Sequence, residues 1–148
     1  MAGIYFHYPF CSQACSYCNF HFSTQTKYRQ EMQQAMNSEL YLRKSELKNP
    51  IESIYFGGGS PSLLPASFFY ETIKSVKNYF ELSKNIEVTL EANPNDLSLK
   101  NLMDLKKSGV NRISLGVQSF KDDELKMMNR IHNANQALKA IESTSKVF

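Results

Sequence analysis

The chain has 148 residues, of which 42% are hydrophobic and 21% charged, and its formal net charge is +3. These values are ordinary for a globular protein of about one domain, which is long enough to bury a hydrophobic core. The basic residues are scattered, which argues against a nucleic-acid-binding surface. No apolar run approaches the ~20 residues of a membrane span, and the N-terminus lacks the pattern of a signal peptide.

The first half of the chain predicts strands and helices in alternation. Residues 4–8 are β-branched and aromatic and end at Pro9, so they predict a strand that leads into a loop containing cysteines. Residues 27–47 carry apolar side chains four residues apart, which predicts a helix that Pro50 ends. Residues 51–56 predict the second strand, which runs into three consecutive glycines.

The second half continues this alternation. A second helix is predicted from apolar residues on one face, namely Phe69, Ile73, Val76 and Phe80. Residues 86–91 predict the third strand, and Ser98 and Gly109 suit the two caps of a third helix. Residues 112–117 predict the fourth strand. Two further helices are predicted from the acidic pair Asp122 and Asp123 and from the apolar residues Ala134, Ala137, Leu138 and Ile141.

About four βα units in a row predict an α/β fold with a parallel sheet and right-handed crossovers. The sheet could be an open doubly wound sheet or part of a (β/α) barrel. In both folds the carboxyl ends of the strands form one edge, and ligands bind there. The cysteine loop, the three glycines, Glu91 and Gln118 each follow one of the four strands, so we expect them to converge at this edge.

All three cysteines lie within eight residues, as Cys11, Cys15 and Cys18, in a C-x3-C-x2-C spacing. Three thiolates on one loop can hold three corners of an iron–sulfur cluster, whereas ordinary electron-transfer clusters take four cysteines. The absent fourth ligand would leave one iron open to another molecule. A disulfide with one cysteine left over is one alternative. A structural zinc site with His7 or His21 as the fourth ligand is another.

Other polar residues have a structural and a functional interpretation. The glycines at 57–59 match neither nucleotide-binding fingerprint, and they predict a tight turn or a close approach of the backbone to a polar ligand. Glu91 could pair with a ligand amine or hydroxyl, and Gln118 could simply cap a turn. His7 and Tyr5 share one face of the first strand and are expected in the core.

Arg130 and His132 are expected by default at an exposed helix end. A cluster of free cysteines in a chain without an export signal predicts a reducing, cytoplasmic location.

Five segments resemble, in order, the oxygen-independent coproporphyrinogen III oxidase family of radical S-adenosylmethionine (SAM) proteins. They are YFHYPFC-x3-C-x-YC from residue 5, GGGSPSLL from residue 57, EANP from residue 91, NRISLGVQSF from residue 111, and R-x-H from residue 130. The fold that this resemblance implies is a partial (β/α) barrel of the radical SAM type.

The resemblance also implies cofactors and their ligands. Cys11, Cys15 and Cys18 would hold three irons of a [4Fe–4S] cluster, and the amino and carboxylate groups of SAM would chelate the fourth iron. Tyr5, Gly58 and Glu91 would contact this SAM. The positions that hold a second SAM in the oxidases are matched by Gly59, Ser60, Gln118 and Arg130. In this family the reduced cluster cleaves SAM to methionine and a 5′-deoxyadenosyl radical, and the protein orients the reactants.

Two departures favour the haem-chaperone branch of this family over the oxidases. Phe20 stands where the oxidases carry a further cysteine, and the chain begins directly at its first strand without their N-terminal extension. The branch implies haem or porphyrin as a ligand, with haem-acceptor proteins and an electron donor as partners. An oxidase that decarboxylates propionates is one alternative, and a zinc-stabilised binding module is another.

The family's barrel has about six βα units followed by a C-terminal domain, and a complete eight-fold barrel takes ~250 residues. Residues 1–148 are therefore expected to be the N-terminal portion of a radical SAM core domain, as a fragment or a truncated gene product, with the remainder absent. A partial barrel would expose an apolar sheet edge, so we expect poor solubility or self-association.

Overall fold

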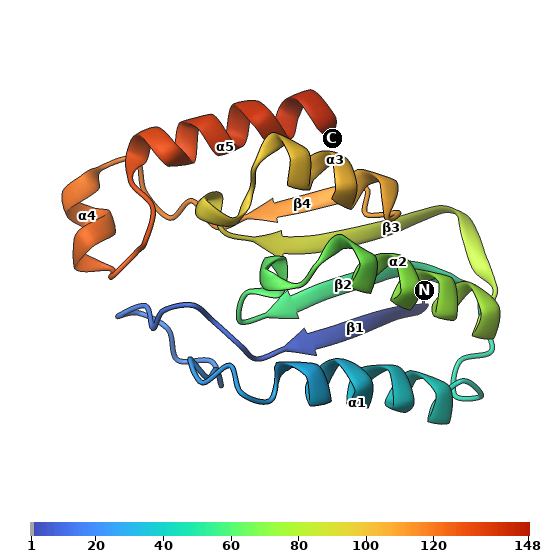
Figure 1. The fold of residues 1–148 in the computed structure, drawn as a ribbon. Coiled ribbons are helices and arrows are strands. Elements are labelled where there is room, and N and C mark those ends of the chain that lie inside the picture. Colours follow the sequence, from blue (N-terminus) through green and yellow to red (C-terminus); the bar gives the residue numbers. More distant parts are fainter. Residues whose placement is uncertain (1) are drawn as a thin grey trace.

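The structure is a computed structural model that describes residues 2–148, and these form one four-stranded parallel sheet with helices between the strands (Figure 1). The strands pair in the order β1 (Ala2–Tyr8), β2 (Ile51–Gly58), β3 (Leu82–Ala92) and β4 (Arg112–Leu115). The helices are α1 (Arg29–Leu42), α2 (Ala66–Tyr79), α3 (Leu99–Lys107), α4 (Asp122–Met127) and α5 (Ala134–Val147). Two short 3₁₀ helices, η1 (Pro61–Leu63) and η2 (Pro94–Asp96), follow β2 and β3.

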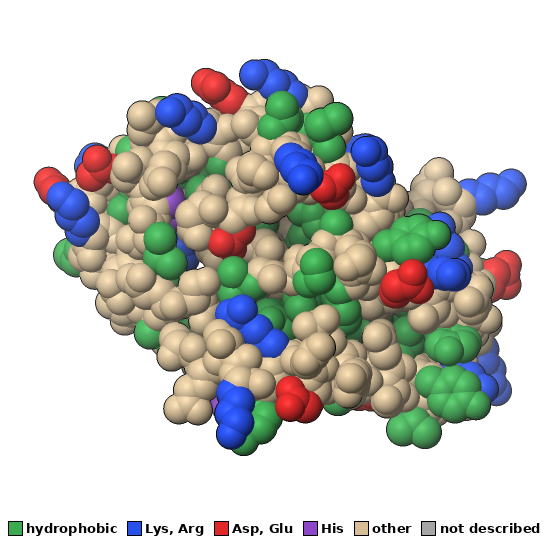
Figure 2. All heavy atoms as spheres, in the orientation of Figure 1, with side chains coloured by type: hydrophobic (Ala, Val, Ile, Leu, Met, Phe, Trp, Pro, Cys, Tyr) green, Lys and Arg blue, Asp and Glu red, His purple; other side chains and the backbone are tan. Residues whose placement is uncertain are grey.

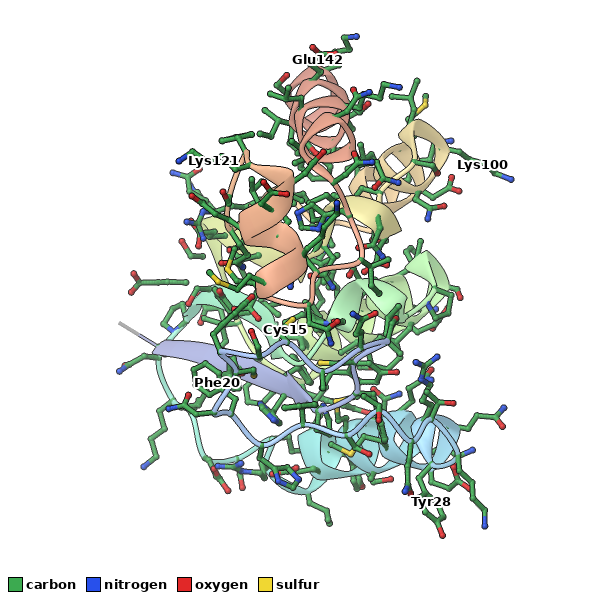
Figure 3. All side chains as sticks on the ribbon, turned by 90° about the vertical axis from the view of Figure 1, so that its left-hand side faces the viewer. Cys15, Phe20, Tyr28, Lys100, Lys121 and Glu142 are labelled. Carbon is green, nitrogen blue, oxygen red and sulfur yellow. The ribbon has the colours of Figure 1, made fainter. Side chains whose placement is uncertain are left out.

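The strand order identifies the sheet as part of a barrel rather than a doubly wound sheet. A doubly wound sheet reverses its strand order at one point and carries helices on both faces. Here the order follows the sequence, and α1, α2 and α3 pack against one another along one side of the sheet (Figures 1 and 3). The four strands do not close into a cylinder, because β1 and β4 each pair with one neighbour among residues 2–148.

Aromatic and aliphatic side chains fill the space between the sheet and its helices. Phe6, Phe56 and Leu90 are in register on neighbouring strands, and all three are buried. The Phe56 ring lies 4.9 Å from the Phe6 ring and 5.0 Å from that of Phe69 on α2, measured between centroids. Each fully buried side chain of this size contributes about 1.5–3 kcal/mol of hydrophobic free energy. This layer therefore supplies most of the stability of the fold.

The face of the sheet that no described helix covers is polar. Tyr5, Tyr55, Thr89 and Arg112 form one row across the four strands. Tyr5 is 56% exposed and His7 is exposed as well, so the expectation that these residues lie in the core is wrong. The outer edges of β1 and β4 carry backbone groups that no neighbouring strand pairs with among residues 2–148, and such edges can pair with another chain. Self-association therefore stays a prediction.

Several element boundaries differ from the sequence prediction, and β3, for example, begins at Leu82, four residues before its predicted start. Helix α1 ends at Leu42, five residues before the predicted end, where Leu42 is 77% exposed and offers no apolar face to continue. Arg43 then forms ion pairs with Glu39 and Glu46 that hold the following turn. Strand β4 ends at Leu115, two residues before its predicted end. The Gly116 N–H still donates to the Ala92 carbonyl of β3, but the Val117 N–H donates to the Leu115 carbonyl of its own strand.

The predicted caps of the third helix are confirmed. The Ser98 side chain accepts a hydrogen bond of 3.1 Å from the Asn101 N–H at the start of α3. Gly109 follows the helix with a φ of +104°, a conformation that glycine adopts without strain. Basic and acidic side chains are interspersed over the face seen in Figure 2. Among residues 2–148, none of the helices combines the length and hydrophobicity needed to cross a bilayer.

Candidate functional site

A cleft with a volume of ≈ 380 Å³ lies at the carboxyl edge of the sheet. Every predicted site residue except Tyr5 lines it, namely Cys11, Cys15, Cys18, Gly58, Gly59, Ser60, Glu91, Gln118 and Arg130. Figure 3 views the molecule from this edge and shows Cys15, on the loop that follows β1, next to α4. The predicted convergence of four segments of the chain on one edge is therefore observed.

The three cysteines are free thiols, half-buried on the wall of this cleft. Burial raises the pKa of the Cys11 thiol, and the charges of Cys18 and Cys15 raise it further, whereas Ser60 and Arg130 act to lower it.

Within residues 2–148, no three cysteine, histidine or acidic side chains surround one point closely enough to ligate a single metal ion. A zinc site requires ligands around one centre, whereas each cysteine of an iron–sulfur cluster binds an iron of its own. His7 is not directed at the cysteines, because its Nδ1 lies 3.0 Å from the Tyr5 hydroxyl, and His21 is exposed.

The cysteine loop is held in place by the chain that follows α4. The Gln13 amide donates to the Asn129 Oδ1 (2.6 Å) and to the Asn129 carbonyl (2.8 Å). The Asn129 amide donates in return to the Ala14 carbonyl (2.7 Å). The Ser16 N–H donates to the carbonyl of Met128 (3.2 Å). We call this set of contacts between 13–16 and 127–129 the loop clamp.

Sequence reasoning missed both Gln13 and Asn129. Asn129 has a φ of +56°, in the left-handed region that asparagine tolerates better than most residues. An asparagine just beyond a predicted short helix was the one local signal that could have marked this turn. Nothing local marks Gln13, because its partner lies 116 residues away.

The glycines leave no room for side chains beside the cysteine loop. Gly58 has a φ of +113°, and a Cβ there would lie 2.8 Å from His7 and 2.9 Å from the Tyr8 carbonyl. A Cβ on Gly59 would lie 2.7 Å from the Phe10 carbonyl and 2.9 Å from the Cys11 sulfur. The backbone at 58–59 therefore packs directly against β1 and the cysteine loop, and both glycines line the cleft; we call this stretch the glycine wall.

Glu91 is oriented by two hydrogen bonds at the base of this wall. Its carboxylate accepts from the Tyr55 hydroxyl (2.7 Å) and from the Gly58 N–H (3.1 Å). Burial raises the pKa of Tyr55, and the hydrogen bond to Glu91 raises it further. Tyr5 stacks on Tyr55 with 5.9 Å between ring centroids, beneath the cleft rather than in it.

Arg130 connects the segments that converge on the cleft. One Nη donates to the Asn93 amide oxygen (2.7 Å) and the Gly116 carbonyl (2.8 Å), and the other to the Cys15 sulfur (3.3 Å). Asn93 in turn donates to the Ser60 hydroxyl (2.9 Å). The Arg130 Nε is buried, and no residue in the range 2–148 accepts from it.

The expectation of an exposed helix end at Arg130 and His132 is therefore wrong. Arg130 is half-buried in the cleft, and His132 is only 2% exposed. Arg130 contacts Cys15 and the Gly116 carbonyl, and His132 contacts the Val117 carbonyl, and local sequence reveals none of these contacts.

The residues present fit a radical SAM cofactor set. Three free thiols on one wall supply the donors that a cluster needs. The cleft lined by the glycine wall supplies room beside them, and the fixed carboxylate of Glu91 supplies an acceptor for an ammonium or hydroxyl group.

Comparisons with known proteins agree with this geometry. The model of the Radical SAM superfamily matches residues 5–148. The radical S-adenosyl methionine domain-containing protein 1, mitochondrial, of Dictyostelium discoideum is 42% identical over 99% of the chain and 37% of its own length. Heme chaperone HemW of Buchnera aphidicola subsp. Schizaphis graminum is 36% identical over 98% of the chain and 39% of its own length.

Among solved structures, the coproporphyrinogen III oxidase HemN of Escherichia coli, described as a radical SAM enzyme, superposes with a TM-score of 0.88. The sequence identity is 23%, and the match covers 99% of this chain and 34% of that one. This likeness supports the fold. The chain spans less than two-fifths of the length of each of these relatives.

Proposed function

The chain belongs to the radical SAM superfamily, and from this premise we propose that it is the cofactor-binding part of a haem chaperone. The observation that carries the proposal is the match, along nearly the whole chain, to relatives named as haem chaperones. Phe20, at the position of the further cysteine that the oxidases carry, supports the same choice. Residues 1–148 would be the N-terminal portion of the radical SAM core domain.

In this proposal Cys11, Cys15 and Cys18 hold a [4Fe–4S] cluster, and SAM occupies the cleft beside it. Bound together, the cluster and SAM supply one-electron chemistry. The backbone of Gly58 contacts the ligand, and the Glu91 carboxylate, which the Gly58 N–H orients, accepts a hydrogen bond from it. The role of Tyr5 as a SAM contact rests on the family resemblance, since its side chain lies outside the cleft.

The four positions that match a second SAM site all line the cleft, although they come from different parts of the chain. Gln118 and Arg130 come from the segments after β4 and α4, while Gly59 and Ser60 follow β2. Arg130 places a positive charge on the cleft wall, and its Nη atoms are held by Asn93, Gly116 and Cys15. We assign these four residues to anion and amide contacts with SAM.

Haem or porphyrin, haem-acceptor proteins and an electron donor are the proposed partners. Relatives of this chain carry the name heme chaperone, which supports haem as a ligand. The cytoplasmic location stays a prediction, because other relatives have the word mitochondrial in their names.

Anaerobic reconstitution of the longest available form of the protein tests the proposal. We expect about four irons per chain, SAM binding that depends on the cluster, and binding of haem. A variant in which all three cysteines are replaced by alanine is the control, and it should lose the iron and SAM binding together. Tightly bound zinc without iron would overturn the proposal, and anaerobic loss of propionate carboxyl groups from coproporphyrinogen III would favour the oxidase.

A further inference from the structure

The backbone at Gln118 is strained. Its φ is +70°, and the Ser119 N–H donates to the Val117 carbonyl over 2.9 Å, which closes a three-residue turn around Gln118. Turns of this kind with a positive central φ are rare. A residue other than glycine remains in such a conformation only where its surroundings dictate it, and such sites cluster where ligands bind.

His132 supplies a second hydrogen bond to the same turn. Its Nε2 lies 3.0 Å from the Val117 carbonyl oxygen, which therefore accepts from His132 and from Ser119 together. Because a carbonyl can only accept, the imidazole carries its proton on Nε2. Nδ1 is buried and has no hydrogen-bond partner in the range 2–148. Burial lowers the pKa of His132, the hydrogen bond to the Val117 carbonyl acts to raise it, and the nearby charge of Arg130 lowers it.

The turn determines where the Gln118 amide lies. A Cβ placed on Gly116 would be 3.3 Å from the Gln118 Nε2 and 3.6 Å from an Arg130 Nη. The Gln118 amide and the Arg130 guanidinium thus lie side by side over Gly116, on the wall of the cleft. A turn with an ordinary negative φ at residue 118 would direct this side chain elsewhere.

We propose that His132 is a positioning residue whose hydrogen bond to the Val117 carbonyl holds Gln118 in its strained turn, so that the Gln118 amide faces the cleft beside Arg130. That the Gln118 amide contacts SAM rests on the proposed function, whereas the positioning of Gln118 by His132 does not. His132 is buried and does not line the cleft, so it acts through Val117 and Gln118.

Two substitutions separate positioning from simple filling of space. His132→Gln keeps an N–H at the reach of Nε2, whereas His132→Leu fills a similar volume without a donor. In the cofactor-free chain we expect His132→Leu to speed hydrogen exchange of the Ser119 amide about tenfold, the loss typical of one hydrogen bond. His132→Gln should restore most of the protection. Equal exchange in His132→Leu and the wild type would overturn the proposal.

A glycine at residue 118 provides a second, independent measurement. Glycine adopts a positive φ without strain, so Gln118→Gly removes the need for His132 to hold the turn. We expect His132→Leu to lower the melting temperature less in the Gln118→Gly background than in the wild type. An equal loss in both backgrounds would mean that His132 serves packing alone, and would contradict the proposal.

SAM titration of the reconstituted protein extends the test to the cleft. His132→Leu should weaken SAM binding about as much as Gln118→Ala, by about tenfold, and the double variant should be no weaker than either. Additive losses would overturn the link between the two residues. If the wild type binds no SAM, the proposed function fails, while the exchange and melting measurements still decide the role of His132.

Discussion

The helix-covered side of the sheet and its carboxyl edge are built in different ways. On the covered side, in-register apolar residues such as Phe6 and Phe56 pack in regular strands. At the edge, Gly58, Gln118 and Asn129 adopt positive φ, and Gly109 after α3 is the one other residue in the range 2–148 that does so. The edge also holds buried nitrogens of Arg130 and His132 that have no partner in that range.

This difference separates stability from function within one small fold. Packing on the covered side offsets the cost of a strained, polar edge, which could not persist without it. Substitutions on the covered side should therefore reduce the free energy of unfolding most. Substitutions at the edge should cost less stability but change the cysteine loop and the cleft.

The largest effect is expected from Phe56→Ala. Phe56 is 1% exposed and contacts rings on β1 and α2, so its removal leaves a cavity and should lower the free energy of unfolding by about 3–5 kcal/mol. Denaturant titration measures this loss. Leu42→Ala on α1 is the control, because Leu42 is 77% exposed and should change stability by no more than about 0.5 kcal/mol. Similar losses of unfolding free energy in the two variants would contradict the claim that packing on the covered side supplies most of the stability.

Gly58→Ala should have the next largest effect. The positive φ at Gly58 and the close Tyr8 carbonyl leave no place for a methyl group, so we expect a loss of about 1–3 kcal/mol together with lower iron retention after reconstitution. Gly3→Ala on β1 is the matched control, because its nearest neighbour is the movable Ser53 hydroxyl and its φ is ordinary. A smaller loss at Gly58 than at Gly3 would refute the role of the glycine wall.

The loop clamp can be divided into its backbone and side-chain parts at Asn129. Asn129→Gly keeps the left-handed conformation without strain but loses the two side-chain hydrogen bonds, from Gln13 and to the Ala14 carbonyl. Asn129→Ala loses the same two hydrogen bonds and also strains the backbone. We expect losses of about 1 and 1–2 kcal/mol respectively. Hydrogen exchange at the Ser16 amide should rise in both variants. Unchanged exchange at Ser16 would show that the loop is ordered without the clamp.

The smallest effect is expected from pH. The lowered pKa of His132 means that the unfolded chain takes up a proton near pH 6.5 while the folded chain resists it. Stability should therefore fall as the pH drops below about 6.5, by at most ~1.4 kcal/mol per pH unit, until the folded-state pKa is passed. Arg130 is the charged side chain that opposes protonation there. His132→Gln should lack this part of the pH dependence, and identical pH profiles would contradict it.

The sequence by itself determined the four βα units, the caps of α3 and the gathering of polar residues at one edge. These features follow from local periodicity and from one general rule, that the strands of a parallel sheet end at the same edge. Cys11, Cys15, Cys18, Glu91 and Gln118 could be placed there before any coordinates, because each follows a predicted strand.

Only the tertiary structure decided which residues hold that edge together. Gln13 meets Asn129 and Cys15 meets Arg130 across more than one hundred residues, so no local pattern records either contact. The burial of His132 and the exposure of Tyr5 were likewise missed, because both depend on which parts of the fold cover each residue. A hydrogen bond between distant segments is a property of the folded chain, and a single sequence carries no periodic signal for it.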